Sequence, residues 1–165
     1  MKFALHSTRS FTLDINPAKL STAQEKGVRI VRTRGGRHIP MFYKKSGMIE
    51  TERLLKAHLS KKKSDTIRKD GNTAVELRII YQFPYTSSHP KWMQDQLSFM
   101  TERPDVDNLS KSLIDCMTEL GFWEDDSMVF PNLSKYRSPN PCIRIQIRVW
   151  KQSRDELEEH LLRNS

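Results

Sequence analysis

The residues best suited to do chemistry are acidic and lie in two short stretches of the second half of the chain. Asp105, Asp107 and Lys111 form the pattern Asp-x-Asp-Asn-x-x-Lys, and Asp125 and Asp126 follow a Phe-Trp-Glu segment. A proline before the first aspartate disfavours helical backbone there, so residues 105–107 are predicted to be extended. Side chains two apart on an extended segment share a face, which sets the first two carboxylates side by side.

A convergence of carboxylates on one point predicts a metal site. We expect the chain to fold Asp126 back toward Asp105 and Asp107. Such groups raise one another's pKa unless a cation lies between them. Oxygen ligands without histidine or cysteine favour Mg²⁺ or Mn²⁺ over zinc, and such an ion activates water and neutralises charge on a scissile phosphate. Lys111 would stabilise the extra negative charge that develops on the scissile phosphate in the transition state, or hold a phosphate.

The same residues also have a purely structural interpretation. Asp107 is expected at or near a helix N-cap, where a short acceptor satisfies free backbone N–H groups. Asp115 is expected to pair with Lys111 rather than to bind a metal. An EF-hand loop is excluded because Leu109 occupies the third ligand position. A non-catalytic DNA-binding protein, whose acids only cap a helix, is therefore the alternative, and an RNA-processing nuclease is a third candidate.

The distribution of basic residues indicates a surface that binds phosphates. The chain has 28 Lys and Arg against 20 Asp and Glu, a formal charge of +8. Residues 1–63 carry 15 basic and 4 acidic groups, whereas residues 105–150 carry 5 and 7. Basic groups set against phosphates release counterions, which favours nucleic-acid binding. The candidate DNA contacts are Arg34, Arg37, Lys44, Lys45 and Lys135.

Alternation and helical spacing of apolar residues predict the elements that must position these groups. Two helices are expected, at residues 52–59 and 107–121, with a further short one at 155–162. A long connection at 84–104 contains Trp92, which is expected to pack against the domain. Strands are predicted at 11–15, 75–81, 128–136 and 143–150, with a hairpin across 28–43. This order predicts a single α+β domain in which helices pack on a mixed β-sheet.

Length and composition narrow the classes of protein further. A chain of 165 residues suits one domain with its own core. Two cysteines are too few for a disulfide framework or a zinc cluster. No apolar run reaches the roughly 20 residues of a membrane span, and the N-terminus lacks the pattern of a signal peptide. We therefore expect a soluble, cytoplasmic protein with no membrane partner and no nucleotide cofactor.

Residues 103–130 resemble the motif of the RusA family of Holliday-junction resolvases. That motif runs basic-Pro-Asp-x-Asp-Asn-Leu-x-Lys, then a helix with an aspartate, then a Gly-x-Trp-x-Asp-Asp turn, and this chain matches it nearly throughout. Residues 36–59 resemble more weakly the family's basic hairpin and following helix. An early Pro- and Arg-rich segment of the family is matched at 28–37 in charge alone, and residues 1–27 form a poorly matched extension.

The resemblance implies a small homodimeric α+β endonuclease formed by one domain over 1–165, with its catalytic motif in 103–136. It implies resolution of four-way (Holliday) DNA junctions by paired symmetric incisions, in recombination and repair, in a bacterium or prophage. It also implies Mg²⁺, with Mn²⁺ as a substitute. By the same resemblance Asp105, Asp107 and Asp126 are metal ligands, Asp125 is a supporting acid in the metal site, and Lys111 is the catalytic lysine.

Overall fold

The computed structural model describes residues 3–22 and 26–152. Its main sheet has the strand order β1-β7-β4-β6-β5, and all neighbours are antiparallel except β4 and β6. The five strands are β1 (Phe3–Leu13), β4 (Thr73–Phe83), β5 (Ser98–Phe99), β6 (Val129–Arg137) and β7 (Cys142–Gln152). The predicted α+β class with a mixed sheet is confirmed. The expected helix at 155–162 lies outside the described residues.

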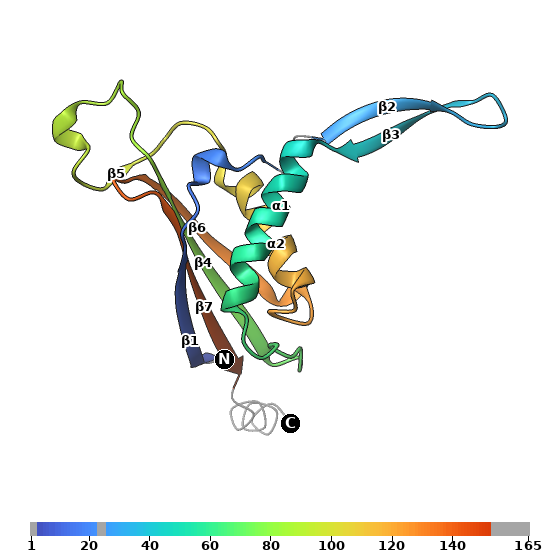
Figure 1. Ribbon diagram of the computed structural model, residues 1–165. Helices are drawn as coiled ribbons and strands as arrows, with labels where there is room; N and C mark the ends of the chain where they lie inside the picture. The colour runs from blue at the N-terminus through green and yellow to red at the C-terminus, as the bar shows by residue number, and fades with distance from the viewer. Residues whose placement is uncertain (1–2, 23–25, 153–165) are drawn as a thin grey trace, which may run out of the picture.

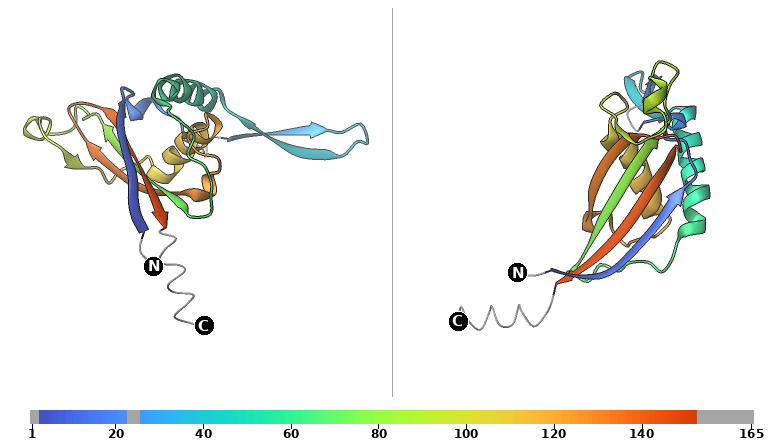
Figure 2. Two further views of the ribbon diagram at one scale, coloured as in Figure 1. Left: turned by 90° about the horizontal axis from the view of Figure 1, so that it is seen from below. Right: turned by 90° about the vertical axis from the view of Figure 1, so that its left-hand side faces the viewer.

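Two helices cover one face of this sheet (Figures 1 and 2). They are α1 (Ser46–Leu59) and α2 (Val106–Glu119). Parallel neighbours such as β4 and β6 need a long crossover connection, and α2 is the helix of that connection. The crossover carries the chain from the end of β4 along the helix to the start of β6. The two ends of α2 therefore lie at opposite ends of the sheet.

The core lies between the sheet and the helices. Alternate residues of β4 and β7 point into it, and the leucine face of α2 meets them. Trp123, only 1% exposed, lies just after α2 and donates from Nε1 to Thr118 Oγ1 at 2.8 Å. Burying each such large apolar side chain contributes about 1.5–3 kcal/mol. No helix in the described ranges is long and apolar enough to span a membrane.

The observed boundaries differ from the predicted ones where packing, rather than apolar periodicity, decides the structure. β1 begins at Phe3, well before the predicted residue 11, because a sheet-edge strand with an open face carries polar residues. α1 begins at Ser46 instead of residue 52. Its first turns are held by buried Met48 and by Thr51, whose Oγ1 accepts from the Ser21 backbone N–H at 2.9 Å.

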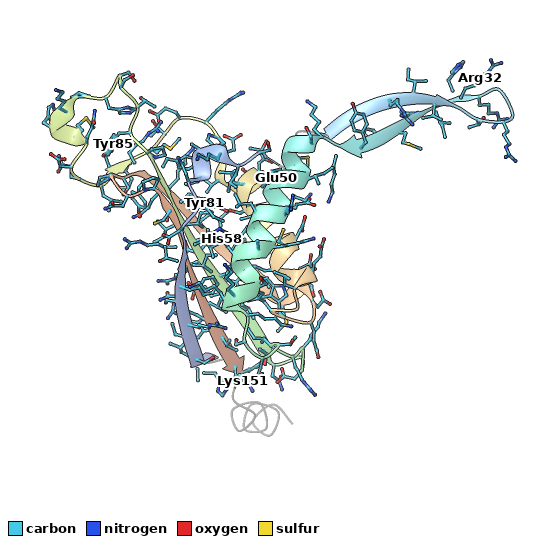
Figure 3. The ribbon with its side chains drawn as sticks, viewed as in Figure 1. Arg32, Glu50, His58, Tyr81, Tyr85 and Lys151 are labelled. Carbon is cyan, nitrogen blue, oxygen red and sulfur yellow. The ribbon has the colours of Figure 1, made fainter. Side chains whose placement is uncertain are left out.

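The predicted hairpin forms a separate two-stranded sheet that projects from the body as an arm (Figure 1). Its strands are β2 (Lys26–Arg32) and β3 (His38–Lys44), and every residue of β3 is exposed. Arg32 lies near its far end (Figure 3). At its base the ring of Tyr43 lies over Gly27, directly where a Cβ atom would be. The arm thus displays its side chains to solvent on both faces.

Candidate active site

The N-terminal end of α2 presents two exposed aspartates. Asp105 is the N-cap residue, with extended backbone, but its side chain makes no capping hydrogen bond. Asp107 lies in the first turn, so the helix starts slightly earlier than predicted. Neither carboxylate makes a hydrogen bond or ion pair with another residue of the described ranges. This observation disfavours the interpretation in which these acids only cap the helix.

A lysine from β6 fixes the segment that carries Asp105. Lys135 points to the helix side of the sheet and donates from Nζ to the backbone carbonyls of Glu102, at 2.5 Å, and Pro104, at 3.0 Å. Nearby, Arg137 donates to the Pro84 carbonyl at 2.7 Å. The chain just before α2 is therefore held to the end of β6.

A different set of contacts holds the chain after α2. Asp125 caps a short 3₁₀ turn, Asp126–Met128, by accepting from the Ser127 backbone N–H at 2.8 Å. Lys69 Nζ lies 2.6 Å from Asp125 Oδ2 and 2.9 Å from Ser127 Oγ. The hydrogen bond from Lys69 is the main reason why the pKa of Asp125 lies well below its usual range. Asp126, the first residue of this turn, is exposed.

One face of α2 connects the two ends. Asp107, Lys111 and Asp115 are exposed along it at helical spacing. Desolvation raises the pKa of Asp115; the positive charge of Lys111 opposes this shift, and the negative charge of Asp126 adds to it. Asp126 therefore lies near Asp115, which belongs to the second half of α2.

The carboxylates do not converge within one chain, and that part of the prediction is wrong. Asp107 and Asp115 are separated by about 12 Å along the helix axis, at 1.5 Å per residue. Asp126 lies by the start of β6, whereas Lys135, which holds the segment of Asp105, lies near the end of that strand. Within residues 3–22 and 26–152, no three His, Cys, Asp or Glu side chains are placed to hold a metal ion.

The chemistry of the acidic residues nevertheless fits a divalent cation. Asp105, Asp107 and Asp126 offer exposed carboxylate oxygens, the ligands that Mg²⁺ and Mn²⁺ prefer. Asp125 differs because both of its oxygens already accept hydrogen bonds from its own chain. Its contacts are those of a residue that positions Asp126.

The predicted DNA contacts fall into two groups. Arg34 and Arg37 are exposed at the turn of the arm, and Lys45 is exposed where the arm joins α1. In contrast, Lys44 donates to both oxygens of Glu52, at 2.7 and 2.9 Å, and this contact raises the pKa of Lys44. The amine of Lys135 is likewise engaged by the backbone carbonyls before α2.

The sequence analysis missed or misjudged three residues outside α2. No sequence pattern around Lys69 predicted its contact with Asp125, because the two residues lie 56 positions apart in the chain. Trp92 was expected to pack against the domain but is 70% exposed. Phe99, on the short strand β5, is 82% exposed with its ring centroid 5.5 Å from that of Tyr136. Exposed aromatic rings therefore lie in the connection between β4 and α2.

The sequence of the chain is similar to those of known proteins. A family model described as "Endodeoxyribonuclease RusA" matches residues 22–148, which include the arm, both helices and both ends of α2. A protein of Lactococcus phage r1t named "Crossover junction endodeoxyribonuclease rusA" is 35% identical over 120 residues, 72% of this chain and 79% of the phage protein. The chain therefore belongs to the RusA endodeoxyribonuclease family.

Proposed function

We propose that this endodeoxyribonuclease resolves four-way DNA junctions as a homodimer whose subunits share each active site. The similar phage protein bears the name of a crossover junction endodeoxyribonuclease. The observation that carries the shared site is the arrangement of α2. At its N-terminal end lie carboxylates without a partner among residues 3–22 and 26–152, and Asp126 lies toward its other end.

Twofold symmetry brings these two ends together. If the exposed faces of two α2 helices pack antiparallel, the N-terminal end of each lies beside the C-terminal end of the other. Asp105 and Asp107 of one subunit then approach Asp126 of the second. Lys111 lies one turn into the helix, so in this arrangement it stays beside Asp105 and Asp107 of its own subunit. Two equivalent sites result, which suits paired symmetric incisions.

Mg²⁺, or Mn²⁺ in its place, would be held by Asp105, Asp107 and Asp126. When bound, the ion supplies a Lewis acid that activates water and offsets charge on the scissile phosphate. Other residues of the chain position the carboxylates that would hold the ion. Lys135 holds the segment that carries Asp105, and Asp125 orients Asp126 through the capped turn. Lys111 is exposed one turn into α2, where its ammonium group can stabilise negative charge on the reacting phosphate.

The arm would bind a duplex arm of the junction. The major groove of DNA admits a two-stranded β-ribbon, and Arg34 and Arg37 at the turn supply charges for phosphates that are unpaired within the described part of the chain. Lys45 at the base adds a third such charge. Because these contacts release counterions, the affinity for junctions should fall as the salt concentration rises.

The test is cleavage of a labelled four-way junction with Mg²⁺ or Mn²⁺, compared with a linear duplex and a structured RNA of equal length. Asp107→Asn should bind the junction like the wild type but cut it at least about 100-fold more slowly, because it removes a proposed ligand of the ion that offsets charge on the scissile phosphate. Asp14→Asn, at another exposed aspartate, is the matched control and should cut normally.

Two outcomes favour the rival functions. Binding of the junction without cleavage in either metal supports the non-catalytic DNA-binding protein. Preferential cleavage of the structured RNA supports an RNA-processing nuclease. Full cleavage by Asp107→Asn contradicts the catalytic role, because asparagine caps a helix as well as aspartate does.

A further inference from the structure

The face of the main sheet that the helices leave open has an unusual set of side chains. Figure 2 (right) shows the strands in front of the helices when the molecule is viewed from this side. Antiparallel register places the outward residues of β1, β7 and β4 in adjacent rows. These residues are mostly basic or neutral polar: Thr8, Ser10, Thr12, Glu76, Arg78, Ile80, Arg144, Gln146 and Arg148.

The one acid in these rows is already neutralised. Glu76 is 6% exposed and accepts from Arg78 Nε at 2.6 Å, Arg148 Nη1 at 2.7 Å and Trp150 Nε1 at 3.1 Å. The hydrogen bond from Arg78 is the largest cause of its lowered pKa. The single negative charge of Glu76 is shared by two positively charged arginines, so these rows keep a net positive charge.

Arg144 carries the charge that is left without an internal partner. It is exposed opposite Thr12 on β1 and Ile80 on β4, and it makes no hydrogen bond or ion pair with other residues of the described chain. The contact of Arg78 with Glu76 uses Nε, so its two terminal nitrogens have no hydrogen-bond partner among the residues that the structure describes.

These groups surround a hollow of about 380 Å³ in the open face. Its lining is both polar and apolar, and consists of Ser10, Phe11, Thr12, Arg78, Ile80, Arg144, Ile145 and Gln146. Gln146 Nε2 donates to Ser10 Oγ at 3.2 Å, which leaves the amide oxygen and the hydroxyl hydrogens available. Beside its apolar residues the lining therefore supplies two guanidinium groups and hydroxyl donors, a set that suits a phosphate group.

We propose that this hollow binds a backbone phosphate of DNA, so that the open sheet face is a second DNA-binding surface. The inference rests on the proposed function, because a four-way junction supplies duplex arms beyond the one that is cut. The arm and the exposed face of α2 belong to the helix side of the molecule, so this surface serves a different part of the substrate (Figures 1 and 2). The surplus of arginine over acid favours DNA as the occupant.

The experiment measures junction affinity by fluorescence anisotropy over a range of salt concentrations, in Ca²⁺ to avoid cleavage. Arg144→Gln should weaken binding about three- to tenfold and reduce the slope of log K against log salt by about 0.9, as expected for one lost phosphate contact. Arg144→Lys should keep the wild-type slope. Arg53→Gln is the matched control, since Arg53 is exposed on α1 with only a 3.9 Å contact to Glu50.

The outcomes separate this inference from the proposed function. If the wild type binds and cuts junctions but Arg144→Gln has the affinity and slope of Arg53→Gln, the second surface is refuted while the resolvase stands. If Arg144→Gln instead changes the molecular mass in sedimentation without changing the affinity, the face is a subunit interface and the proposal is also refuted. A wild type that neither binds nor cuts junctions refutes the proposed function itself.

Discussion

Replacing Lys135 with methionine should separate a positioning role from a DNA contact. The side chain is half-buried and gives its ammonium group to the carbonyls of Glu102 and Pro104, directly before Asp105. Methionine keeps the apolar stem but removes both hydrogen bonds. Because hydrogen bonds from a charged donor contribute about 1.5–3 kcal/mol, and this site is only half-buried, the free energy of unfolding should fall by about 2 kcal/mol. For a chain of this size, Tm should fall by about 4–8 °C.

The kinetic consequence distinguishes the two roles. With the segment before α2 released, Asp105 is held less firmly, and the single-turnover cleavage rate at saturating junction should fall at least about tenfold. Junction affinity in Ca²⁺ should stay within about twofold of the wild type, since the amine is occupied by backbone. Lys45→Met, at an exposed lysine without a partner in the described chain, is the control and should weaken binding alone. Weaker binding by Lys135→Met, with an unchanged rate at saturation, would refute the positioning role.

Three further predictions follow from other contacts. Gly27→Ala would place a Cβ against the Tyr43 ring, so junction affinity should drop severalfold with little change in Tm; unchanged affinity would show that the arm base does not matter for binding. The pKa of Glu76 is lowered in the folded state, so its stabilisation is present above the unfolded pKa of about 4.3 and is lost as pH falls through the folded value. Urea unfolding should therefore show a smaller loss of stability between pH 7 and pH 3 in Glu76→Gln, and equal losses would contradict this. Lys69→Met should slow cleavage but not weaken junction binding, because it loosens the turn that contains Asp126; an unaltered rate would exclude that coupling.

Much of the fold followed from local patterns in the sequence. The strand at 75–81 and the helix that begins near Asp107 were predicted because one face of each is buried against the core, which forces apolar residues to recur at period 2 or 3.6. The first half of β1 was not predicted from this pattern. Residues 4–10 lie on an edge strand with little burial, so their alternation is weak.

The candidate site was predicted by residue type but not by geometry. The motif placed Asp105, Asp107 and Lys111 correctly at the start of a helix. It could not place Asp126, because distance along the chain does not reveal that the crossover connection carries it to the far end of the sheet. The contacts of Lys69 and Lys135 escaped prediction for a related reason. Each joins segments more than 30 residues apart, and no local periodicity encodes such a pairing.

The shared active site is tested most directly by mixing two inactive variants, Asp107→Asn and Asp126→Asn, under conditions that allow subunits to exchange. A site built from two subunits gives each mixed dimer one intact site, with Asp107 from one chain and Asp126 from the other. The equimolar mixture should then nick junctions with about one quarter of the wild-type sites active, while each variant alone stays inactive. A mixture that exchanges subunits and binds junctions, yet shows no nicking, would contradict the shared site.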